Sequence, residues 1–248
     1  MANWSDPSGP ATAFNPATGA IDARFDQGLR SHMLRVYNYM ASGVLLTGIV
    51  AMLFSSGGAD SYAAQVFING GALAWIIKLS PLAFILVLSF GINRLSTVAA
   101  QGLFWAFATV MGLSLSTIFL VYTDASIAQA FFSTAVAFLG LSLFGYTTKK
   151  DLSGMGVFLL MGLFGLIGAT LLNVFVFQSG AFDLMISIVG VLIFAGLTAW
   201  DTQMIKNEYA HVAGTSYEGK AVIMAALNLY LDFINMFLYL LRIFGSRD

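Results

Sequence analysis

The sequence predicts an all-α integral membrane protein with seven transmembrane helices, and its composition is the first reason. Of the 248 residues, 58% are hydrophobic and only 9% are charged, and the mean hydropathy is +0.84. A soluble domain carries about 25% charged residues, so a water-soluble enzyme is excluded. The net charge of −1 provides no basic surface, which excludes nucleic acid as a partner. We therefore expect a lipid bilayer around most of the chain.

The lengths of the apolar segments are the second reason. A helix that crosses the membrane needs about 20 predominantly apolar residues, whereas a strand of a membrane barrel needs only about 10 alternating ones. Polar or turn residues separate the segments from one another, and long continuous segments favour helices. The seven predicted spans are residues 36–54, 72–92, 97–122, 127–146, 154–177, 184–205 and 221–244.

The N-terminal region differs from the rest of the chain. Residues 1–35 contain three of the four prolines together with Ser, Asn, Thr and Gly, a composition typical of a disordered tail. No apolar core lies near Met1, so a secretory signal peptide is not expected. We predict a disordered cytoplasmic tail over 1–35, in which His32 is solvated, followed by a transmembrane domain over 36–248.

The distribution of positive charge predicts the orientation. Lys and Arg side chains concentrate on the cytoplasmic side of membrane proteins. The loops after the first, third and fifth spans contain no Lys or Arg, although Arg242 and Arg247 mildly oppose the rule at the C-terminus. We expect a cytoplasmic N-terminus and a C-terminus on the opposite side of a bacterial inner membrane. The cations of the tail and the remaining loops are Arg24, Arg30, Arg35, Arg94, Lys149, Lys150, Lys206 and Lys220.

Two aspartates inside the predicted spans are candidate functional residues. An ionisable side chain in the membrane interior costs at least about 2.5 kcal/mol, so Asp201 and Asp232 indicate a functional site. The alternative is a protonated Asp that only hydrogen-bonds a neighbouring helix. Asn228, Asp232, Asn235 and Tyr239 follow one another at i+4, i+3 and i+4, so they form a polar stripe on one face of the last span.

This stripe has a chemistry that fits cations. Ca²⁺ prefers several oxygen ligands, and Asp201, Asp232, Asn228 and Asn235 offer oxygens to it. Two close carboxylates in a low-dielectric site cannot both ionise easily, so they share a proton and titrate as a pair. If the two helices bring Asp201 and Asp232 level, one pair of this kind can serve as cation site and proton sensor together. A proton-coupled transporter would need the same arrangement.

Several segments resemble a known family. Residues 196–206 and 227–235, followed by 241–245, are similar to the two signature helices of the Bax inhibitor-1 (TMBIM) family, and residues 90–95 resemble its bacterial members. The resemblance implies a seven-helix fold with the last helix central. It also implies a pH-sensitive calcium leak, sensed by a pair matched by Asp201 and Asp232. It further implies a state-dependent ion pair between one of these aspartates and Arg94.

Other functions remain open at this stage. The chain could be a regulatory membrane protein that binds a partner such as a membrane protease, or a proton-coupled secondary transporter. We expect no enzyme and no resident cofactor: the chain has no cysteine, no familiar catalytic motif, and no protease-type motif around either aspartate. Calcium is expected only as the transported ion of a channel.

Overall fold

The computed structural model describes residues 16–246, with side chains from residue 25 onward, and this part of the chain is helical without strands. Seven of its helices are long and apolar enough to cross a membrane, which confirms the predicted class. A short helix, α2 (Tyr62–Asn69), lies between the first two of them. The seven are α1 (Pro16–Ser55), α3 (Ala72–Gly91), α4 (Thr97–Leu115), α5 (Asp124–Thr147), α6 (Ser153–Leu172), α7 (Gly180–Val212) and α8 (Glu218–Phe244).

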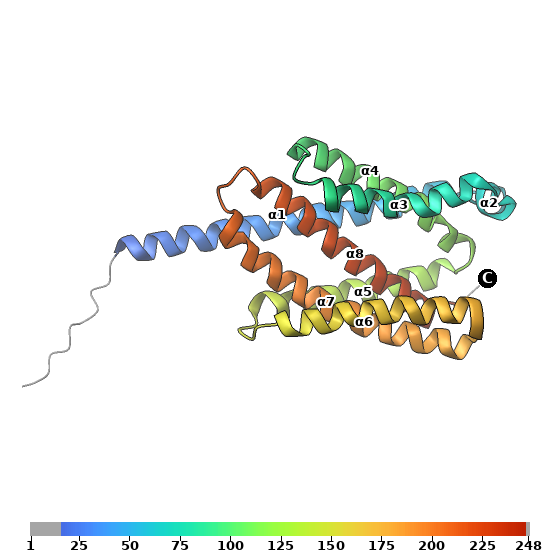
Figure 1. Cartoon of the computed structure of the whole chain (residues 1–248). Coiled ribbons are helices and arrows are strands. Elements are labelled where there is room, and N and C mark those ends of the chain that lie inside the picture. Colours follow the sequence, from blue (N-terminus) through green and yellow to red (C-terminus); the bar gives the residue numbers. More distant parts are fainter. Residues whose placement is uncertain (1–15, 247–248) are drawn as a thin grey trace, which may run out of the picture.

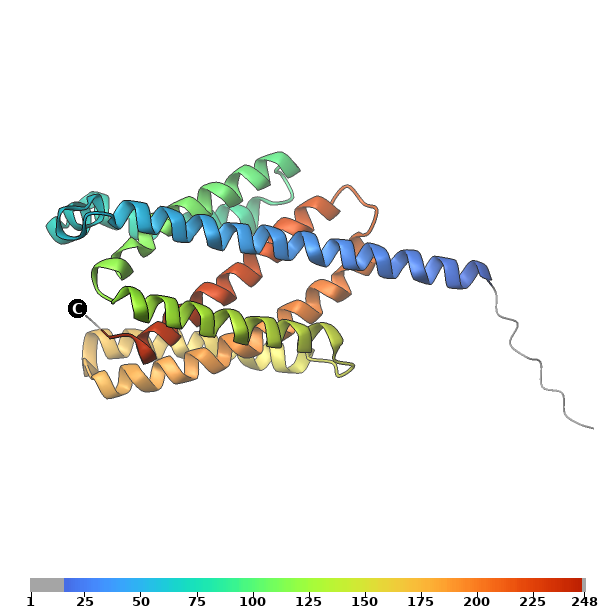
Figure 2. The same ribbon diagram turned by 180° about the vertical axis from the view of Figure 1, so that it is seen from behind.

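The last helix is the most deeply buried of the seven. In its most apolar stretch 72% of the residues are buried, against 17–33% in the other six helices. It packs against α1, α4, α5 and α7, and Figures 1 and 2 show it crossing the bundle obliquely between them. Of the polar stripe on α8, Asp232 is buried, whereas Asn228, Asn235 and Tyr239 are part-buried. The more specific expectation, that α8 stands at the centre of the bundle, stays a prediction.

The first helix begins earlier than predicted. Residues 16–35 are helical and belong to α1, so the boundary of the predicted tail is corrected; residues 1–15 lie outside the described part. The physical reason is a buried face: Leu29, Met33 and Val36 recur at helical spacing and all three are buried. An ion pair between Arg35 and Glu218 also fixes this part of α1 to the start of α8.

The same face of α1 corrects the expectation for His32. Its side chain is only 1% exposed, and its ring centroid lies 5.1 Å from that of Tyr209 on α7. His32 Nδ1 is buried and has no hydrogen-bond partner within the described residues. A histidine that the sequence places in a solvated tail is therefore part of the contact between α1 and the α7–α8 hairpin.

The loops that carry the predicted cytoplasmic cations meet at one end of the bundle. Lys220 Nζ donates to the Asn93 carbonyl at 3.4 Å, and Lys206 Nζ donates to the Tyr146 carbonyl at 2.8 Å. These contacts join the start of α8 to the α3–α4 turn and α7 to the end of α5. We call this the cation-rich end of the bundle; the opposite end holds the C-terminus and α2 (Figure 1).

Candidate functional site

The contact between α7 and α8 brings the two intramembrane aspartates together. Asp201 is 7% exposed and Asp232 is 4% exposed, and their carboxyl groups are hydrogen-bonded to each other. A carboxylate has no donor, so this bond requires one shared proton. Asp232 Oδ2 is buried and has no hydrogen-bond partner in the described part of the chain. The pair therefore presents a carboxyl oxygen that is free to accept a proton or to bind a cation.

The length of the α7–α8 hairpin explains why the two carboxyls come level. From Asp201 to the end of α7 at Val212 the helix continues for about 17 Å, at 1.5 Å per residue. From the start of α8 at Glu218 to Asp232 the chain returns by about 21 Å. The two legs nearly match, so the polar positions of the two helices face each other. The hairpin extends past the pair toward the cation-rich end (Figure 1).

A glutamine close to the pair fixes the position of α7 relative to the loop between α5 and α6. Gln203, two residues after Asp201, accepts a hydrogen bond from the Leu152 N–H at 2.8 Å and donates to the Lys150 carbonyl at 2.8 Å. Both partners belong to the loop between α5 and α6, so the side-chain amide ties α7 to the cation-rich end. Asp201 lies about half a helical turn before Gln203, whose side chain reaches that loop.

The pair lines a cavity of about 590 Å³ between α6, α7 and α8. The structure brings all four predicted oxygen-bearing residues to this one space: Asp201 from α7, and Asn228, Asp232 and Asn235 from α8. Most of the remaining lining is apolar, from Leu160 on α6 to Leu231 on α8. The cavity is thus a low-dielectric space with a single polar wall, which strengthens any interaction between a cation and the carboxyls.

An aromatic side chain closes the other end of this polar wall. Tyr239 hydrogen-bonds Thr170 on α6, and its ring stacks on Phe194 with centroids 6.0 Å apart. The guanidinium of Arg242 lies 5.4 Å from the Tyr239 ring centroid and 3.9 Å from the Asp183 carboxylate. The polar stripe of α8 therefore continues from Asp232 to an ion pair at the end of the bundle opposite the cations.

Arg94 is not brought to the aspartates. It lies exposed at the turn between α3 and α4, and no ion pair with Asp201 or Asp232 occurs among the described residues. The other predicted site residues meet in one cavity, whereas the predicted ion pair of Arg94 is not formed in this conformation. A state-dependent pair stays a prediction.

The donor set is a weak one for a stored metal. Within the described residues, no group of three or more His, Cys, Asp or Glu side chains lies close enough to hold a metal ion. Ca²⁺ takes six to eight oxygen ligands, so two carboxyls and two amides would need water to complete its shell. The side chains at the cavity therefore supply only part of a calcium shell.

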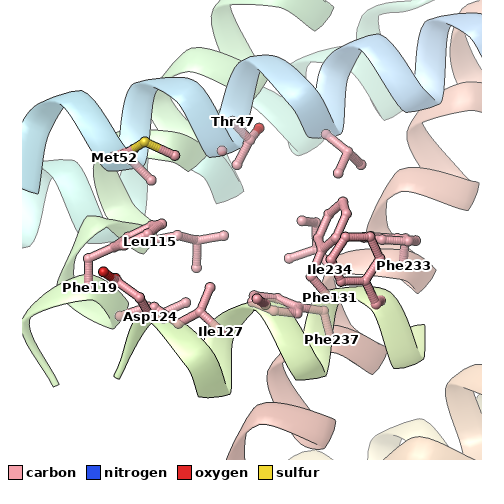
Figure 3. Close-up of a pocket in the computed structure, with 16 residues that line it drawn as sticks. Thr47, Met52, Leu115, Phe119, Asp124, Ile127, Phe131, Phe233, Ile234 and Phe237 are labelled. Atoms are coloured by element: carbon pink, nitrogen blue, oxygen red, sulfur yellow. The ribbon is translucent and has the colours of Figure 1, made fainter. Parts of the chain in front are cut away.

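A different cavity lies between α1, α5 and α8 and has a volume of about 410 Å³ (Figure 3). Its lining is almost entirely apolar, and Figure 3 shows Phe131, Phe233 and Phe237 gathered at one side. The carboxylate of Asp124 lies at the other side, on the first turn of α5. This cavity lacks the paired carboxyls and is not the candidate ion site.

The fold and the site together define a class of protein: a seven-helix integral membrane protein with a hydrogen-bonded aspartate pair beside a cavity between α6, α7 and α8. A family model described as "Inhibitor of apoptosis-promoting Bax1" matches residues 29–248. The chain therefore belongs to this family, the Bax inhibitor-1 family, which confirms the resemblance seen in the sequence.

Bacterial relatives match almost the whole chain. An uncharacterized protein of Rickettsia prowazekii is 46% identical over 231 residues, which are 93% of this chain and 95% of the relative. A protein named "Inner membrane protein YbhL" from Escherichia coli K12 is 46% identical over 225 residues, 89% of this chain and 93% of the relative. A protein of Caulobacter vibrioides is 42% identical over 233 residues, 91% of this chain and 92% of the relative.

Proposed function

We propose that the protein is a pH-sensitive calcium leak channel, gated by the coupled pair Asp201 and Asp232. The observation that carries the proposal is the buried, hydrogen-bonded carboxyl pair beside a cavity of about 590 Å³. A buried pair that shares a proton holds one negative charge in an apolar surrounding. That charge attracts a cation, and a second proton cancels it.

Calcium is the cation we favour because of the chemistry of the cavity wall. Hard divalent cations prefer carboxylate and amide oxygens, which Asp201, Asp232, Asn228 and Asn235 supply in one space. At low pH the pair is fully protonated, and its attraction for Ca²⁺ is lost. At higher pH the pair loses its shared proton and binds Ca²⁺ more strongly. Protons and calcium therefore compete for one site, which makes the leak pH-sensitive.

Calcium flux into proteoliposomes at a series of pH values tests the proposal. The purified full chain should admit Ca²⁺ down its gradient, with a rate that changes with pH and rises in proportion to the gradient. Saturable flux coupled to proton counter-flow would instead identify a secondary transporter. Vesicles with protein that admit no more Ca²⁺ than empty vesicles at any pH would refute the proposal.

Arg94 provides a second test of gating. If it pairs with Asp201 or Asp232 in another state, the Arg94→Ala variant should lose that state and show altered calcium flux or a shifted pH profile. Hydrogen bonds between charged groups contribute about 1.5–3 kcal/mol, so the shift in the balance of states should be about tenfold or more. The measurement is the same flux assay at matched protein levels. An unchanged rate and pH profile would show that Arg94 only anchors the cytoplasmic end.

The proposed orientation places the N-terminus and the cation-rich end in the cytoplasm of a bacterial inner membrane. The chain has no native cysteine, so single cysteines report accessibility without background. Ser56→Cys, at the end opposite the cations, should react with an impermeant thiol reagent on intact cells. Ser216→Cys, in the α7–α8 turn, should react only after the membrane is broken. Both serines are exposed. The reversed pattern would show the opposite orientation.

A further inference from the structure

A continuous apolar groove follows the boundary between α1 and α5. α1 packs against α4 and α8, and α5 packs against α7 and α8, so α8 forms the floor between them. Three cavities of about 380, 510 and 410 Å³ follow one another along this boundary. The first two share Tyr37 and Leu139, and the last two share Phe131 and Phe233. Figure 3 shows the last of them, with α1 and α5 on opposite sides.

The groove is as long as the membrane is thick. Its lining on α1 runs from Arg30 to Met52, about 33 Å along the helix, and the hydrocarbon core of a bilayer is about 30 Å thick. The middle section is apolar and contains small residues, Ala41 on α1 and Ala135 on α5, which leave it open. Its shape therefore suits a flexible hydrocarbon chain that lies along the membrane normal.

The two ends of the groove differ in charge. At the cation-rich end it is lined by Arg30, Ser142 and Tyr146. The ammonium group of Lys206 adds a second positive charge there, 5.2 Å from the Tyr146 ring centroid. At the opposite end the groove is lined by the carboxylate-bearing Asp124. A ligand with one anionic group joined to an apolar chain matches this polarity in only one direction.

We propose that the groove binds an anionic phospholipid from the leaflet at the cation-rich end. Its phosphate lies at Arg30, beside the Tyr146 hydroxyl, and one acyl chain runs between α1 and α5 past Ala41. Lipid tails are as apolar as the groove, so burial of the tail alone gives no preference for this site. The preference comes from the positive charge at the headgroup and from the fit of the chain.

The headgroup part is tested by native mass spectrometry of the full chain in detergent, with phosphatidylglycerol or phosphatidylcholine added. The wild type should retain phosphatidylglycerol preferentially. Arg30→Gln removes a charge-assisted hydrogen bond, so it should weaken phosphatidylglycerol binding about tenfold and leave phosphatidylcholine binding unchanged. Equal retention of the two lipids by the wild type, or no effect of Arg30→Gln, would overturn the proposal.

The acyl-chain part uses two neighbouring residues of α1. Ala41→Phe fills the middle section and should lower the retention of both lipids. Ser42→Phe adds the same ring at an exposed position that lies outside the three cavities, so it should change neither. Equal effects of the two variants would show that the groove is not the binding site. A lipid-free dimer that Ala41→Phe dissociates would assign the groove to a second copy of the chain instead.

Discussion

Replacement of Asp201 or Asp232 by asparagine is expected to lower calcium flux about tenfold or more and to flatten its pH dependence. Asparagine nearly keeps the shape of aspartate but cannot ionise, so either variant removes one of the two carboxyl groups that would bind the cation. It also breaks the shared-proton pair and leaves one carboxyl that titrates alone. An interaction between charged partners is worth about 1.5–3 kcal/mol, which corresponds to a factor of about ten to a hundred. The measurement is calcium flux into proteoliposomes across a pH series.

The two substitutions should also be strongly non-additive. Each one alone breaks the shared-proton unit, so the double variant should lose little more than either single variant, with a coupling of about 0.5–3 kcal/mol. Asp60→Asn is the matched control, because Asp60 lies in a short, exposed turn after α1. Thermal unfolding should be similar for all variants. If both single variants keep the wild-type flux and pH profile, the pair is structural only.

The seven helices follow from the sequence because hydropathy is a local property. Each predicted span lies within, or nearly within, one helix of the structure, and the polar stripe of α8 lines the cavity between α6, α7 and α8. The meeting of Asp201 and Asp232 was harder to predict. It depends on how far the α7–α8 hairpin extends past the pair, and hydropathy does not report the relative shift of two helices.

The early start of α1 and the burial of His32 were not predicted, for a related reason. The segment before residue 36 contains charged residues, which lower its mean hydropathy. The average therefore does not reveal the narrow apolar stripe that Leu29, Met33 and Val36 form on one helix face. His32 falls on that stripe, which was the available signal. Its burial depends on Tyr209, more than a hundred residues away, and no local pattern reports such a contact.

The cavity beside the pair also depends on long-range packing. α6 and α8 both pack against α7. The space that remains between α6 and α8 is the cavity beside the aspartate pair. The position of α7 is therefore as important as the identity of the aspartates. It is set by Gln203, through its bonds to the α5–α6 loop, and by a close contact between α5 and α7 at Gly145.

Gly145→Ala is expected to destabilise the protein by about 1–3 kcal/mol, the usual effect of overpacking a tight core. A methyl group at Gly145 would lie 2.2 Å from the carbonyl oxygen of Ala199 on α7. That neighbour is backbone and cannot rotate away, so α5 and α7 would have to separate. Since Ala199 is two residues before Asp201, the separation would also move the carboxyl pair. Thermal unfolding in detergent, followed by circular dichroism, measures the loss.

The control is a second glycine of the same helix. A methyl group at Gly140 meets nothing within 4 Å, so Gly140→Ala should be neutral or stabilise by up to about 1 kcal/mol through the gain in helix propensity. The comparison separates the contact with α7 from the general effect of alanine in α5. Gly145→Ala should also reduce calcium flux in the protein that remains folded, because the displacement of α7 changes the position of Asp201 relative to Asp232. Equal stability of the two variants would mean that the close approach of α5 to α7 does not position the pair.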